Sequence, residues 1–132
     1  MGAYCTRVPL KPGLAAAVSL DVGEHDTAVA LHSGDVPVLA TPRLIALCEE
    51  ASLRAVAGLV PAGHTTVGMR VQLDHLVPTG VGARVTAEAT LEKVEGRRLT
   101  FTVSATDERG LVAAGKVTRV VVDVDRFLEK CS

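Results

Sequence analysis

Residues 83–106 read ARVTAEATLEKVEGRRLTFTVSAT, and their regular alternation of apolar or small side chains with polar ones decides the fold. Apolar residues occupy every second position in the runs Ala83–Leu91 and Leu99–Ala105. This period of two is typical of a strand with one buried face. Between the runs lies Glu95-Gly96-Arg97, a tight-turn sequence. The stretch therefore predicts two long antiparallel strands that share one face in the core.

Two more strands flank this pair in the sequence. Apolar and polar side chains alternate in residues 66–75, so one face of this strand is predicted to carry Val67, Met69, Val71 and Leu73. A turn at 107–110 starts a last strand that runs to about Val124. The short connections predict an antiparallel meander. Part of the last strand is apolar on both faces, so we expect a partner subunit to cover the second face.

The segment before these strands carries the signals of a helix. Thr41 offers an N-cap hydroxyl, and Pro42 suits the first helical position. We expect the helix to run to about Leu59, where a Gly and a Pro end it. Its polar side chains form one narrow stripe made of Arg43, Glu50 and Arg54. The rest is apolar or small, so the helix is predicted to be buried nearly all round.

The N-terminal part is less regular. Residues 1–13 are predicted to be irregular, and 14–22 and 27–31 to be short extended pieces. The chain of 132 residues has the usual size of one domain, so we expect a single domain over 1–132. One helix followed by four antiparallel strands predicts the α+β class, with a curved sheet wrapped round one central helix.

Composition excludes several classes of protein. The net charge is -1, with acidic and basic residues mixed and few aromatic side chains, so we expect no nucleic acid partner. No apolar run spans a bilayer, so we expect no membrane association. The three widely spaced cysteines suit neither a disulfide framework nor zinc, which favours a cytoplasmic protein. The histidine spacings predict no metal site.

Two titratable residues lie where the pattern calls for apolar ones. Glu49 points about 120° from the polar stripe of the helix, and His75 falls in line with Leu73 in strand alternation. A carboxylate facing an imidazole suits general-base chemistry, and Thr41 adds a hydroxyl beside free helix amides. The plainer alternatives are a Glu that reaches solvent or meets an arginine, a core histidine bonded to a carbonyl, and an ordinary N-cap.

The same residues carry a family resemblance. Residues 40–51 (ATPRLIALCEEA), the strand end Leu73-Asp74-His75 and the hairpin 94–99 resemble the fluoroacetyl-CoA thioesterase family of hot-dog proteins. The resemblance covers about residues 35–128. Its most specific part is the spacing of eight residues from Thr41 to Glu49 and twenty-six from Glu49 to His75.

The resemblance implies a hot-dog fold and hydrolysis of a small acyl-CoA thioester by a homodimer, or by a tetramer of paired dimers, with active sites at the interface. It implies that Thr41 contacts the acyl or oxyanion end, that Glu49 is base or nucleophile, and that His75 assists it. Coenzyme A would be part of the substrate, with no separate cofactor. It implies that Gly68 lines the acyl pocket, and we expect Leu39 and Met69 also to bind the substrate.

Two other readings stay open. One is a hot-dog acyl-CoA hydratase or dehydratase, although its Asp and His pair is not found. The other is a non-catalytic acyl-CoA-binding hot-dog protein. The family's fluoroacetyl-specific members carry aromatic residues before the helix, whereas residues 35–39 read DVPVL. We therefore expect hydrolysis of small acyl-CoA thioesters without strong preference for a fluorinated acyl group.

Overall fold

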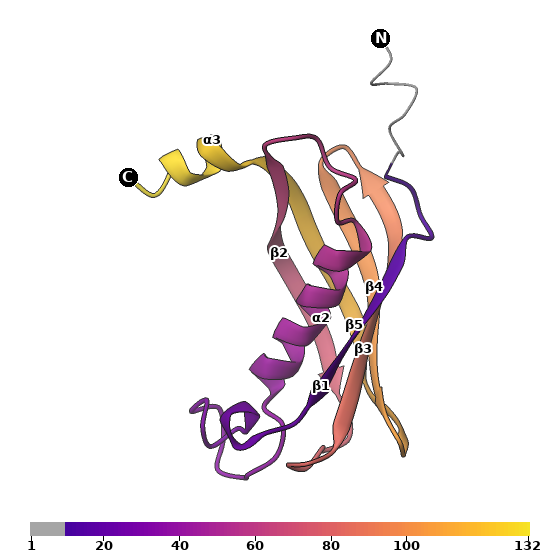
Figure 1. The fold of residues 1–132 in the computed structure, drawn as a ribbon, viewed down its shortest axis with the longest axis vertical. Helices are drawn as coiled ribbons and strands as arrows, with labels where there is room; N and C mark the ends of the chain where they lie inside the picture. Colours follow the sequence, from indigo (N-terminus) through magenta and orange to yellow (C-terminus); the bar gives the residue numbers. More distant parts are fainter. Residues whose placement is uncertain (1–9) are drawn as a thin grey trace.

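The computed structural model describes residues 10–132; the expected irregular segment lies mostly outside them. Within these residues the chain forms five strands, two α-helices and one 3-10 helix (Figure 1). In chain order these elements are β1 (Ala15–Asp21), η1 (Glu24–Asp26), α2 (Thr41–Ala55), β2 (His64–His75), β3 (Arg84–Glu95), β4 (Arg98–Asp107), β5 (Gly110–Asp123) and α3 (Val124–Glu129).

The five strands make one antiparallel sheet in the order β1-β3-β4-β5-β2. The predicted meander is confirmed for β3, β4 and β5, but it is wrong for β2, which pairs with β5 and not with β3. The connection from β2 to β3 covers residues 76–83, too long for a tight hairpin, and β1 occupies the free edge of β3. As a result β2 is an edge strand of the sheet.

The sheet curves round α2, which lies across its concave face (Figure 1). The predicted alternation in β3 and β4 is confirmed, because Val85 to Leu91 and Leu99 to Ala105 bury every second side chain. The helix supplies the other half of the core with Leu44, Leu47, Cys48, Ala51, Ser52 and Ala55. Burying a side chain of leucine size contributes roughly 2 kcal/mol, so this contact is what holds helix and sheet together.

The helix differs from its prediction in three ways. Its N-cap is Ala40, and Thr41 is the first helical residue, so the threonine hydroxyl does not cap the helix. It ends at Ala55, about one turn earlier than expected, because the backbone turns at Val56 and reaches a left-handed Gly58 with φ 77°. It is also not buried all round, since Leu53 is 40% exposed.

The edge strand β2 contains a β-bulge between Gly68 and Arg70, where its register against β5 shifts. The predicted inward position of Met69 is therefore wrong, and this residue is 46% exposed. Beyond the bulge Val71 and Leu73 pack against the core, as predicted. Strict alternation fails here because a bulge inserts one extra residue into the strand.

Two further segments have a secondary structure that differs from the one predicted from the sequence. Residues 27–31 form turns after η1 and not a strand; Thr27 makes only an isolated bridge to Leu39. Helix α3 was not predicted; it starts when Asp123 caps the amide of Arg126. Within residues 10–132, no helix combines the length and the apolar character needed to cross a membrane.

Candidate active site

Thr41 and His75 are brought together by the first turn of α2 and the last residue of β2. The threonine Oγ1 lies 2.8 Å from His75 Nδ1, so the two side chains share a hydrogen bond. Because Ala40 is the N-cap, the Thr41 hydroxyl is free to make this contact and sits at the positive end of the helix. The contact between Thr41 and His75 was not predicted, because the sequence analysis placed the threonine hydroxyl at the N-cap.

The imidazole of His75 is half-buried, and this burial lowers its pKa from the usual value of 6.5, opposed by the backbone of Val77. At neutral pH the ring is therefore uncharged and has a nitrogen lone pair to accept a proton. Its other nitrogen, Nε2, is buried and has no hydrogen-bond partner within residues 10–132. A buried polar atom without a protein partner is uncommon in a folded chain, and a catalytic role is one of the explanations for it.

The Thr41–His75 contact opens into a small, mainly apolar cavity of about 330 Å³. Leu39, which is 1% exposed, lies in its wall. The segment before α2 adds Val36 and Val38 to the lining, and the segment after β2 adds Leu76 and Val77. A cavity with these aliphatic walls fits a short acyl group beside a hydroxyl and an imidazole.

Glu49 lies near the middle of α2, where it meets β2 and β5. Its Oε2 is 3.3 Å from Arg119 Nη1, and the carboxylate side chain is 34% exposed. Gly68 packs directly under the carboxylate, so closely that a Cβ at that position would overlap Oε2. The glycine is thus required for the close approach of helix and strand at Glu49.

Arg119 is a site residue that the sequence analysis missed. Although charged, it is only 7% exposed; its Nε donates to Thr66 Oγ1 at 2.9 Å and its Nη2 to the Thr66 carbonyl at 2.7 Å. Burial lowers its pKa, against the opposing effect of Glu49. Strand alternation was the available signal, because Arg119 lies between the inward Val117 and Val121, as His75 follows Leu73.

The predicted facing of Glu49 and His75 is not found within one chain. Thr41 and Glu49 are eight residues apart on α2, a separation of about 12 Å along a helix axis. On β2, Gly68 and His75 are separated by roughly 20 Å of strand. One chain therefore carries two half-sites, Thr41 with His75 and Glu49 with Gly68 and Arg119.

The other candidates are placed as follows. Met69 lies in the edge strand β2, at the bulge, and its side chain is exposed. Cys48 is buried in the core, and this burial, with the neighbouring Glu49 carboxylate, raises its pKa to about 11. Across the described residues, no cluster of three or more histidine, cysteine or acidic side chains is suited to hold a metal ion.

Comparison with known proteins adds independent findings. A family model described as fluoroacetyl-CoA-specific thioesterase matches residues 22–125. A fluoroacetyl-CoA thioesterase from Streptantibioticus cattleyicolor is 36% identical over 93 residues, which cover 70% of this chain and 67% of that protein. A crystal structure of a fluoroacetyl-CoA-specific thioesterase variant superposes with a TM-score of 0.88 at 29% identity, over 94% of this chain and 96% of the other.

A second solved structure is more distant in sequence. A thioesterase superfamily member from Thermus thermophilus matches with a TM-score of 0.84 at 26% identity, over 93% of each chain. The curved antiparallel sheet round one helix, shared with these proteins, defines a hot-dog-fold thioester hydrolase. More specifically, the chain belongs to the fluoroacetyl-CoA-specific thioesterase family.

Proposed function

We propose that this protein is an acyl-CoA thioesterase that hydrolyses small acyl thioesters to the free acid and coenzyme A. The observation that carries the proposal is the Thr41–His75 hydrogen bond at the mouth of a small apolar cavity. Family membership supports the reaction class. A variant of a fluoroacetyl-CoA-specific thioesterase with the same fold has been crystallised in complex with fluoroacetate and CoA.

The reaction needs a base, a water molecule and a site that stabilises the developing oxyanion. Water attacks the thioester carbonyl, its proton passes to a base, the carbon–sulfur bond breaks and CoA leaves as the thiol after taking up a proton. Thr41 lies at the start of α2, where backbone amides and the helix dipole stabilise negative charge. His75 is uncharged at neutral pH and Glu49 is the carboxylate, so these two groups move the proton.

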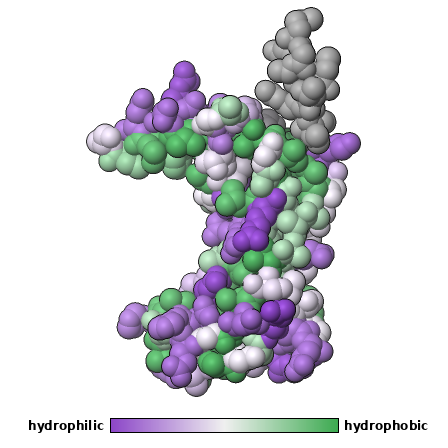
Figure 2. All heavy atoms as spheres, in the orientation of Figure 1, coloured by the Kyte–Doolittle hydropathy of each residue, from purple (hydrophilic) through white to green (hydrophobic). Residues whose placement is uncertain are grey.

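The active form is a homodimer in which Glu49 of one subunit completes the Thr41–His75 pair of the other. Three features support this. The face of α2 that carries Glu49 also exposes Leu53, and the edge strand β2 exposes Met69. The edge of β2 is unpaired within the described chain. Figure 2 shows the molecule hollowed on this side, between α3 and the segment before α2. A two-fold related copy placed there would bring opposite half-sites together.

Subunit complementation tests this arrangement. Glu49→Gln and His75→Ala should each be nearly inactive alone. Refolded as an equal mixture, half of the dimers are mixed, and each mixed dimer holds one intact site and one doubly altered site. We therefore expect recovery of about a quarter of the wild-type activity. Glu50→Gln, which pairs with Arg54 on the helix surface, is the matched control and should stay fully active. No recovery in the mixture would show that each site is built within one chain.

The substrate is tested with a panel of acyl-CoA thioesters, scored by release of free CoA. We expect turnover of acetyl-CoA and propionyl-CoA without strong preference for fluoroacetyl-CoA, because the segment before α2 lines the cavity with Val36 and Val38 and no aromatic residue. A thousandfold preference for fluoroacetyl-CoA, or about 4 kcal/mol in the transition state, would contradict this reading. Binding without CoA release would make the protein a non-catalytic acyl-CoA-binding module.

Two further parts of the proposal concern the whole chain. We propose that residues 1–132 form one domain, since β1 and β5, from opposite ends of the sequence, belong to the same sheet. We also propose a cytoplasmic location, which agrees with the free thiols of Cys48 and Cys131.

A further inference from the structure

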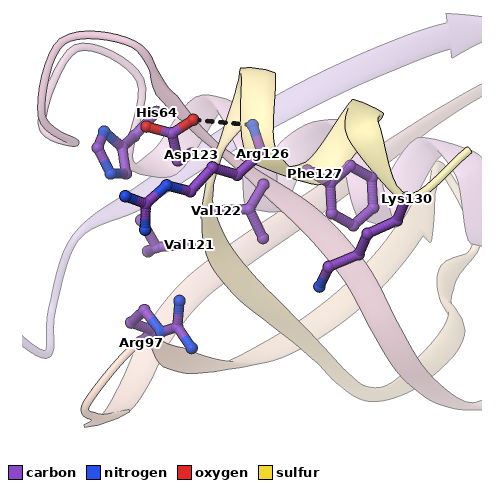
Figure 3. Close-up of a pocket in the computed structure, with 8 residues that line it drawn as sticks. All are labelled: His64, Arg97, Val121, Val122, Asp123, Arg126, Phe127 and Lys130. Atoms are coloured by element: carbon purple, nitrogen blue, oxygen red, sulfur yellow. Dashed lines mark hydrogen bonds between the residues drawn. The ribbon is translucent and has the colours of Figure 1, made fainter. Parts of the chain in front are cut away.

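A second cavity of about 470 Å³ lies at the far end of β2 from His75, between the ends of β2 and β5, the β3–β4 turn and helix α3. Its apolar floor is made by Val121, Val122 and Phe127. Figure 3 shows the charged ends of three side chains round the same opening: Arg97 from the β3–β4 turn, and Arg126 and Lys130 from the α3 segment.

These three cations have no ion-pair partner among residues 10–132. Of the thirteen Lys and Arg side chains in that range, seven are paired with carboxylates and six, including these three, are not. The one carboxylate at the cavity, Asp123, accepts a hydrogen bond from the Arg126 backbone amide at 3.0 Å, which caps α3. The lining therefore holds three positive groups against one negative group, in a chain whose net charge is -1.

Strand geometry places Val121 and Asp123 of the lining on the face of the sheet that carries Glu49, while Val122 of the lining lies on the opposite face at the strand end. On β5, Val121 and Asp123 follow Arg119 at intervals of two residues, and side chains at such intervals share a face. On β2, His64 is four residues before Gly68, in the part of the strand that precedes the bulge. Four residues of strand span about 13 Å, so His64 in the cavity lining lies about that far along β2 from Gly68, which contacts the Glu49 carboxylate.

We propose that this cavity binds the phosphate groups of the coenzyme A part of the substrate. The proposal rests on the proposed function, and it assigns a binding site to the end of the substrate opposite the thioester. The pantetheine arm between a thioester sulfur and the CoA diphosphate has about thirteen bonds, or roughly 15 Å at the reach of an extended chain. It can therefore span the interval from Glu49 to the cavity. Arg97 and Arg126 provide forked donors for phosphate oxygens, and Lys130 adds a point charge.

The test compares substrates that do and do not carry phosphate. Arg97→Ala combined with Arg126→Ala should raise the KM for acetyl-CoA about tenfold or more, with kcat nearly unchanged. With acetyl-N-acetylcysteamine, a thioester without phosphates, kcat/KM should equal that of the wild type. Arg98→Ala is the matched control, because Arg98 is also unpaired within the described range but does not line this cavity, and it should leave the KM for acetyl-CoA unchanged.

An unchanged KM for acetyl-CoA in the double variant would overturn the proposal, and so would an equal loss on both thioesters, which would indicate a general structural effect. Acetyl-dephospho-CoA, which lacks the 3′-phosphate, separates the two phosphate groups. If the wild-type KM for this substrate is raised as much as the KM of the double variant for acetyl-CoA, the cavity binds the 3′-phosphate. If the wild-type KM is the same for both substrates, the cavity binds the diphosphate. Calorimetry measures the affinity of the cavity for CoA independently of catalysis. A wild-type protein that binds CoA more tightly than the double variant but hydrolyses no thioester would retain the cavity assignment and overturn the proposed function.

Discussion

Replacing Gly68 by alanine should displace the Glu49 carboxylate while leaving the fold intact. The new Cβ would overlap Glu49 Oε2, which must retreat by about 1 Å to reach an ordinary carbon–oxygen contact of about 3.3 Å. The retreat also lengthens the 3.3 Å contact with Arg119. Displacement of a catalytic group by 1 Å costs about a hundredfold in rate, or ~2.7 kcal/mol in the transition state.

The stability cost should be small, because the displaced atom is the end of a flexible side chain and the ion pair is partly exposed; we expect less than about 1 kcal/mol. The assay is kcat/KM for acetyl-CoA together with urea unfolding of the same samples. Gly80→Ala is the control, since no described atom lies within 4 Å of a Cβ there, and it should be silent in both measurements. If Gly68→Ala kept kcat/KM within about threefold of wild type, the position of Glu49 would not depend on this glycine.

Three other predictions concern burial and packing. Because burial lowers the pKa of His75, the acidic limb of the kcat/KM profile should lie below pH 6.5. The unfolded chain binds this proton more readily than the folded one, so the free energy of unfolding should also decline as the pH drops below 6.5. This decline should be smaller in His75→Gln. With its pKa raised to about 11, the thiol of Cys48 should resist iodoacetamide in the native protein while exposed Cys131 reacts, as peptide mapping by mass spectrometry will show. Gly115→Ala should cost several kcal/mol in urea unfolding, because the Cβ would overlap the Gln72 backbone across the β2–β5 ladder; a loss below 1 kcal/mol would contradict the close strand approach.

Local patterns predicted the elements whose partners are near in the sequence. The β3–β4 pair follows from alternation and a tight turn, and both signals lie within residues 83–106. The transfer of β2 to the far edge of the sheet has no local signal, because it depends on which strand reaches β5 first in three dimensions. The bulge at Met69 also has no local sequence signal, because apolar and polar residues still alternate on either side of it.

The candidate site was predictable residue by residue but not as an arrangement. Glu49 and His75 stood out because each interrupts an apolar face, and both lie against the core side of the fold. Their separation on opposite parts of α2 and β2 is a tertiary property that periodicity does not contain. Arg119 interrupts an apolar face in the same way, but a long cationic side chain reads as surface until its partner, the Thr66 carbonyl, is known.

The bulge in β2 makes the chain sensitive to length rather than to side-chain identity. Gly68 and His75 are seven residues apart, an odd number, so on a regular strand they would lie on opposite faces of the sheet. One extra residue at the bulge lets both face α2, where one meets Glu49 and the other Thr41. Many residue types could therefore replace Met69 without harm, whereas deletion of this single position would turn one of the two half-sites outward. Relatives that keep both half-sites should tolerate substitution at this position and preserve its place in the chain.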